Sequence, residues 1–72
     1  MKLWYQDLIK KLIELRESKH VTQVELARLL NKPQSYVSKV EILERRLDVI
    51  ELCDWLKVLD KEIMIFINQF NF

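Results

Sequence analysis

The sequence contains no glycine, a single proline and a single cysteine among its 72 residues. Without glycine the chain has none of the glycine-rich loops that cradle phosphate groups in nucleotide-binding enzymes. With Cys53 as its one cysteine it has no partner for an intramolecular disulfide, which favours a reducing compartment. The longest apolar run, residues 63–67, is too short to cross a bilayer, and charged residues at the N-terminal end exclude a signal peptide. These absences predict a soluble, cytoplasmic protein with no membrane partner.

Half of the residues are apolar and about a third are charged. Leucine and isoleucine are prominent, a composition typical of a compact all-α protein. Seventy-two residues suffice for one domain, residues 1–72, with a small core and no deep catalytic pocket. No nucleophile–base pair is visible, and neither His20 nor Cys53 has a second histidine or cysteine at metal-ligand spacing. We therefore expect no enzyme activity, no metal and no cofactor.

Charge is distributed unevenly, although the net charge is only +1. Residues 1–46 carry ten basic and six acidic side chains, whereas residues 47–72 carry two basic and five acidic ones. The basic part, residues 1–46, could therefore bind a polyanion. In the alternative, the charges cluster by chance on an ordinary solvated surface.

The first half of the chain has the pattern of three helices. Apolar residues recur at helical spacing over residues 3–18, which predicts a first helix with one buried face. Thr22 and Glu25 have capping-box spacing and begin a second helix that ends at Asn31, a residue that tolerates the left-handed conformation. Pro33 suits the first turn of a third helix, expected over residues 33–40 with Gln34, Ser35 and Lys39 facing outward.

The second half predicts two more helices. Asp48 and Glu51 form another capping-box pair and begin the fourth helix. Apolar residues at helical spacing predict the fifth over residues 60–70, although five apolar residues in a row also fit a short strand. The whole pattern describes a compact five-helix bundle.

Residues 15–59 resemble the helix-turn-helix domain of the Cro/cI repressor family, also called the XRE family, which has a lambda-repressor-like fold. The matching segments are LR at 15–16, TQVELARLL at 22–30, QSYVSKVE at 34–41, ERR at 44–46 and DVIELCDWLKVL at 48–59. The resemblance implies that the second helix crosses the DNA backbone and that the third lies in the major groove.

The resemblance also implies roles for individual residues. Base edges would be read by Gln34, Ser35 and Lys39, whose side chains are chemically suited to adenine and guanine acceptors and donors. Positions that touch the DNA backbone or the adjacent groove correspond to Gln23, Tyr36, Ser38, Arg45 and Arg46, and Lys32 adds charge for a phosphate. Arg16 and Glu41 match a structural ion pair that joins the first and third helices. The base-reading roles have alternatives. Lys39 could be an ordinary solvated surface residue, and Gln34 and Ser35 could simply form the first turn of the helix.

The sequence departs from the family where the family often has glycine, at His20, Asn31, Leu43 and Asp60, and where it has proline, at Leu47. Asn31 is a mild substitute, but a leucine in a left-handed conformation costs roughly 1–2 kcal/mol. We therefore expect either that the third helix continues through Ile42 to about Arg46 or that the loop takes another path.

The predicted function is sequence-specific binding of double-stranded DNA by a repressor-like transcriptional regulator, acting as a homodimer on a palindromic operator. Residues 60–72 would contribute to the dimer because they hold more apolar area than the end of a small domain buries. The predicted interface residues are Ile63, Phe66, Ile67 and Phe70, with Met64, Ile65 and Phe72 beside them. In the alternative, these side chains close the core of their own domain with Trp4, Tyr5 and Trp55. A second candidate is a DNA-binding antitoxin or protein-interaction module whose C-terminal end binds a partner protein.

Overall fold

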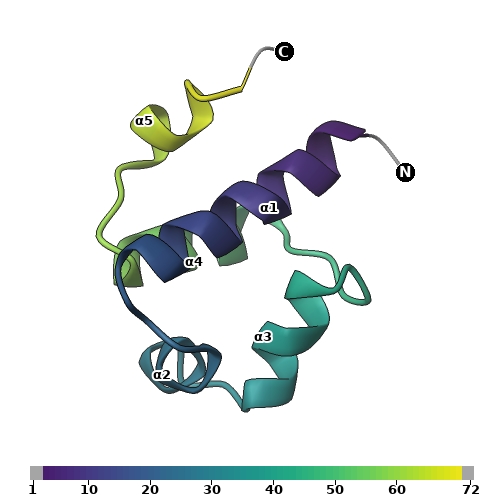
Figure 1. Cartoon of the computed structure of the whole chain (residues 1–72), viewed down its shortest axis with the longest axis vertical. Helices are drawn as coiled ribbons and strands as arrows, with labels where there is room; N and C mark the ends of the chain where they lie inside the picture. The colour runs from purple at the N-terminus through teal and green to yellow at the C-terminus, as the bar shows by residue number, and fades with distance from the viewer. Residues whose placement is uncertain (1–2, 71–72) are drawn as a thin grey trace.

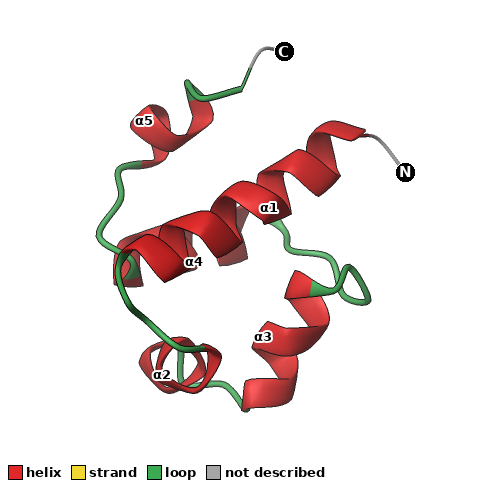
Figure 2. Cartoon of the chain, viewed as in Figure 1, coloured by secondary structure: helices red, strands yellow, loops and turns green. Residues whose placement is uncertain are grey.

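The computed structural model of the chain describes residues 3–70, and this part consists of helices joined by short turns (Figure 2). The five helices are α1 (Leu3–Ser18), α2 (Gln23–Leu29), α3 (Gln34–Glu41), α4 (Val49–Val58) and α5 (Ile63–Ile67). In the view of Figure 1, α1 crosses the middle of the molecule, with α2 and α3 below it and α5 above it. The all-α, five-helix prediction is confirmed.

The core lies where the apolar faces of all five helices meet. Its least exposed members, Leu12, Leu26, Val37, Val40 and Trp55, have no solvent exposure. The other core residues are Tyr5, Leu8, Ile9, Ala27, Tyr36, Leu52, Leu56, Leu59 and Phe66. Because α2 packs on α3 and α3 also contacts α1, the short third helix is held from two sides.

Both predicted capping boxes are present. The amide of Glu25 donates to Thr22 Oγ1 at 3.0 Å, and the Thr22 amide donates back to Glu25 Oε1 at 3.1 Å. At the start of α4 the corresponding distances between Asp48 and Glu51 are 2.7 and 3.0 Å. These reciprocal bonds satisfy amides that have no partner inside the helix, and so they fix where α2 and α4 begin.

Helices α1 to α4 all end in the same way, without glycine. His20, Asn31, Leu43 and Asp60 have φ angles of 58°, 58°, 68° and 56°. In each case the next residue donates its amide to the carbonyl five residues back, as Lys32 does to Ala27 at 2.9 Å and Glu44 to Lys39 at 2.8 Å. This is the Schellman closure, which normally uses glycine at the left-handed position.

Neither expectation for the segment after the third helix is correct. The helix ends at Glu41, and Leu43 itself adopts the left-handed conformation. The amides of Leu43 and Glu44 donate to carbonyls of the last helical turn, and these bonds oppose the steric cost at Leu43. The fifth helix is also shorter than predicted, because Asp60 still belongs to the turn that closes α4 and Glu62 is the N-cap of α5.

We predict that Leu43→Gly is more stable than Leu43→Ala by about 1 kcal/mol, because alanine keeps the steric cost of a left-handed residue and glycine removes it. Both variants delete the same partly exposed side chain, so their difference isolates the backbone term. In thermal unfolding the glycine variant should melt roughly 4–8 °C higher, as expected for a domain of this size. Equal melting temperatures would contradict a left-handed Leu43.

Candidate nucleic-acid interface

The third helix presents two chemically different faces. Val37 and Val40 are completely buried, whereas Gln34, Ser35 and Lys39 are exposed. The exposed residues share one side because the helical repeat separates them from the buried valines. An eight-residue helix with a polar, basic outer face has hydrogen-bonding groups that the protein core does not use.

Glu41, at the end of α3, connects three helices. Arg16 of α1 donates from Nε to Glu41 Oε2 at 2.8 Å and from Nη2 to Oε1 at 3.0 Å. Gln23 of α2 donates from Nε2 to the same Oε1 at 2.8 Å. The third donor group of Arg16, Nη1, reaches the carbonyl of Val21 at 2.8 Å. With side-chain exposures of 11% for Arg16 and 4% for Glu41, this ion pair lies largely out of solvent and fixes α3 against α1 and α2.

Gln23 is half-buried at the first position of α2. One N–H of its side-chain amide is used by Glu41, and the amide group carries a second N–H. The structure thus holds the Gln23 side chain in a fixed orientation at the helix start, next to the end of α3.

Tyr36 is largely buried, and its predicted contact with the DNA backbone or the adjacent groove stays a prediction. The side chain is only 9% exposed and its ring meets that of Trp55 edge to face, with centroids 6.1 Å apart. The hydroxyl accepts a hydrogen bond from Trp55 Nε1 at 3.1 Å and donates to Glu51 Oε2 at 3.4 Å. Burial raises the pKa of this hydroxyl. Tyr36 therefore joins α3 to α4 inside the protein.

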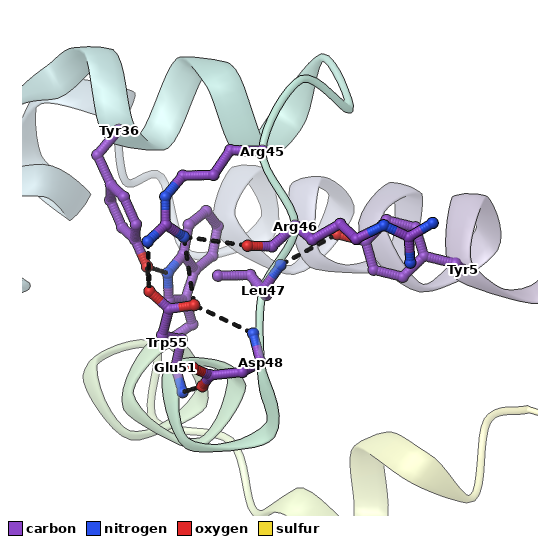
Figure 3. Close-up of polar contacts among 8 residues, drawn as sticks. All are labelled: Tyr5, Tyr36, Arg45, Arg46, Leu47, Asp48, Glu51 and Trp55. Carbon is purple, nitrogen blue, oxygen red and sulfur yellow. Dashed lines mark hydrogen bonds and ion pairs between the residues drawn. The ribbon is translucent and has the colours of Figure 1, made fainter. Parts of the chain in front are cut away.

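Arg45, in the segment between α3 and α4, pairs with Glu51 (Figure 3). Nη2 lies 2.9 Å from Glu51 Oε2, and Nη1 donates to Oε1 at 3.2 Å and to the carbonyl of Arg46 at 3.0 Å. The guanidinium also lies over the Tyr36 ring, 4.7 Å from its centroid.

The bond from Arg45 lowers the pKa of the Glu51 carboxyl, and the same bond raises the pKa of Arg45. The contribution of Glu51 to stability is accordingly present above its ordinary pKa of 4.5 and is lost as the pH falls through the lower pKa of the folded state. At neutral pH both partners are charged.

Arg46 and Leu47 attach the same segment to α1. The Arg46 guanidinium lies 5.2 Å from the centroid of the Tyr5 ring, and the Leu47 amide donates to the Tyr5 hydroxyl at 3.2 Å. Tyr5 is buried, so its ring and hydroxyl give the exposed segment a fixed support.

The two remaining residues predicted to contact the DNA backbone are Lys32, just before α3, and Ser38, within it. Lys32 is exposed in the turn before α3, with Nζ 5.5 Å from the centroid of the Tyr36 ring. Ser38 is half-buried, and its hydroxyl donates to the carbonyl of Ser35 at 3.3 Å. Lys32, Gln34, Ser35, Lys39 and the 42–47 segment thus lie at or next to one helix.

The hydrogen-bond network around Glu51 and Trp55 was not predicted from the sequence. The signal that did exist was the capping box, which uses the Glu51 amide and one carboxylate oxygen. The sequence does not show that the same carboxylate also accepts hydrogen bonds from Arg45 and Tyr36, because Tyr36 lies 15 residues away in the chain.

The predicted dimer residues near the end of the chain differ in their exposure to solvent. Phe66 is only 1% exposed and packs in the core of its own chain, and its part in a dimer interface stays a prediction. Ile63, Ile67 and Phe70 are partly buried against that core. Met64 and Ile65 are exposed at 59% and 53%, and Phe72 lies outside the described residues.

Between residues 3 and 70, no helix has the length and apolar character needed to cross a membrane. In the same part of the chain, no cluster of three or more histidine, cysteine, aspartate or glutamate side chains is arranged to hold a metal ion.

Two short helices joined by a tight turn, the second with a buried apolar face and an exposed polar face, define a helix-turn-helix DNA-binding domain. A family model described as Helix-turn-helix matches residues 12–66. The chain belongs to this XRE-type helix-turn-helix family of DNA-binding transcription regulators.

The solved structure of an "XRE-family like protein from Pseudomonas syringae pv. tomato str. DC3000" is similar to this chain, with 43% sequence identity and a TM-score of 0.86. The match covers 90% of this chain and 79% of that one. A search of curated proteins found no match.

Proposed function

We propose that the chain recognises a specific sequence of double-stranded DNA through the exposed face of α3 and represses transcription as a homodimer. The observation that carries the proposal is the division of α3 into a buried valine face and an exposed face with Gln34, Ser35 and Lys39. Gln forms bidentate hydrogen bonds with adenine, Lys donates to the acceptors of guanine, and Ser bonds to several base atoms. These side chains would determine which sequence is bound.

Contacts with phosphates would orient α3 in the major groove. The residues proposed for this role are Gln23, Lys32, Ser38, Arg45 and Arg46. Gln23 suits it because Glu41 already orients its amide, and preorganised donors lose less conformational freedom on binding. Phosphate contacts contribute affinity and salt dependence but no direct sequence information.

The homodimer would use the end of the chain that includes α5. Met64 and Ile65 are exposed, and Ile63, Ile67 and Phe70 are only partly covered, so a second copy would remove this apolar surface from water. Two α3 helices related by a twofold axis would then enter successive major grooves about 34 Å apart. Sedimentation at high micromolar concentration tests the dimer, and a monomer under those conditions would favour a different partner protein at this surface.

Selection of bound sites from a random duplex library tests the proposed function. We expect enrichment of a palindrome whose half-sites are about 10 base pairs apart, centre to centre. The same selection with Gln34→Ala or Lys39→Ala should change the preferred base within the half-site. If no sequence is enriched by the unmodified protein, sequence-specific binding is refuted.

A further inference from the structure

Ile42, directly after the last residue of α3, exposes an apolar side chain to solvent. The side chain is 61% exposed. The Ile42 amide donates to the carbonyl of Ser38 at 3.0 Å, which is the bond that a residue inside the helix would make. Ile42 therefore continues the helical register one position beyond Glu41, and its side chain belongs to the surface of α3.

The register places Ile42 on the face of α3 that carries Ser35 and Lys39. With 3.6 residues per turn, these three positions lie within about 60° of one another around the helix axis. Val37 and Val40, which are completely buried, lie on the opposite side. The exposed face of α3 thus presents a hydroxyl, an ammonium and a branched alkyl group in one stripe.

Hydrogen bonds hold the backbone that follows Ile42. The amide of Leu43 donates to the carbonyl of Val40 at 3.1 Å, and the amide of Glu44 donates to that of Lys39 at 2.8 Å. Isoleucine is also branched at Cβ, which restricts its χ1 rotamers. Methyl groups that are held in this way lose little conformational freedom when they contact a ligand.

The major groove of DNA offers one kind of apolar group to such a side chain. Most groups on the base edges are hydrogen-bond donors and acceptors, which an alkyl group cannot satisfy, whereas thymine carries a C5-methyl group. Contact between this methyl group and the Ile42 side chain removes both from water and is favourable.

We propose that Ile42 is a further specificity-determining residue, which selects thymine by contact with its C5-methyl group. The inference rests on the proposed function, because it assigns a base to the same face of α3. Ser35 and Ile42 are seven positions apart in the sequence, which is about 10 Å along the helix axis. At a rise of about 3.4 Å per base pair, the selected thymine should lie roughly three base pairs from the base that Ser35 contacts.

The test replaces thymine by deoxyuridine in the palindrome enriched by selection, at one symmetrical pair of positions at a time. Deoxyuridine keeps the hydrogen-bonding groups of thymine and lacks only the methyl group. At one position the unmodified protein should bind about fourfold more weakly for each half-site changed, the effect expected for one buried methyl group. Ile42→Ala should bind the thymine and deoxyuridine duplexes equally at that position, because the side chain that contacts the methyl group has been removed.

Ile50→Ala is the matched control. Ile50 is 74% exposed and lies on α4, so the same atoms are removed at another place on the surface. This variant should keep the full loss of affinity on deoxyuridine. Ile42→Ala should also keep the affinity of the unmodified protein for a scrambled duplex, because that affinity comes from contacts with phosphates. Circular dichroism verifies that both variants are folded.

Three results would each overturn the inference. A deoxyuridine effect that persists in Ile42→Ala would show that another residue contacts the methyl group. Equal weakening of the selected and scrambled duplexes by Ile42→Ala would place Ile42 against the DNA backbone. The third is a palindrome in which no thymine methyl group contributes to affinity. Failure of the unmodified protein to prefer any duplex would instead refute the proposed function itself.

Discussion

Replacement of Arg16 by methionine is expected to lower the free energy of unfolding by about 3–5 kcal/mol. Methionine fills a similar volume but leaves the Glu41 carboxylate, whose side chain is 4% exposed, without its positive partner. Only the hydrogen bond from Gln23 Nε2 would remain on that carboxylate, and a buried charge without a counter-ion is costly. Because a chain of 72 residues has a total stability of roughly 4–11 kcal/mol, the variant would lose much of it.

Urea denaturation measures this loss, with Glu17→Gln as the control on the exposed side of the same helix. The double replacement Arg16→Met with Glu41→Leu should recover most of the stability, because it removes both charges and leaves neither one unpaired. A cost below about 1 kcal/mol for Arg16→Met, the range of exposed ion pairs, would show that Arg16 and Glu41 are not buried together.

Trp55→Ala should destabilise the protein by about 3–5 kcal/mol, as expected for the loss of a large side chain from a packed core. Trp55 is fully buried and supplies the hydrogen bond at 3.1 Å to the Tyr36 hydroxyl, so its removal loosens α3 from α4. Trp55→Phe keeps most of the ring volume and should cost about 1–3 kcal/mol, because it removes the donor to a buried hydroxyl.

The matched control is Trp4→Ala. Trp4 is 51% exposed, so the same chemical change should cost about 1 kcal/mol or less. Thermal or urea unfolding of the three variants compares them directly. Equal losses at positions 4 and 55 would contradict the placement of Trp55 at the centre of the core.

Local signals in the sequence predicted most of the helix boundaries. The first helix extends over Leu3–Ser18 as expected, since the periodic apolar face ends where Ser18, Lys19 and His20 begin. The Thr22–Glu25 and Asp48–Glu51 boxes marked the starts of α2 and α4, because a capping box depends on residues only three positions apart. Asn31 takes the left-handed conformation predicted for it.

Features that depend on tertiary packing were not predictable in the same way. From its position in the helix-turn-helix motif, Tyr36 was expected to be exposed. In the structure it is buried and forms hydrogen bonds with Trp55 and Glu51. The apolar run at 63–67 contains no polar residue to show which side faces the core, so the sequence did not distinguish buried Phe66 from exposed Met64 and Ile65. At Leu43 the local preference against a left-handed residue was overcome by the hydrogen bonds that close α3.

The measurement that most directly tests recognition by α3 is the ratio of affinities for the selected palindrome and for a scrambled duplex at one salt concentration. For the unmodified protein we expect a ratio of at least about 10³. In Lys39→Ala the ratio should fall by roughly 5- to 150-fold, the effect of about 1–3 kcal/mol for one lost base contact, while affinity for the scrambled duplex changes much less. A ratio near one for the unmodified protein, or a ratio that Lys39→Ala and Gln34→Ala both leave unchanged, would contradict sequence reading by the exposed face of α3.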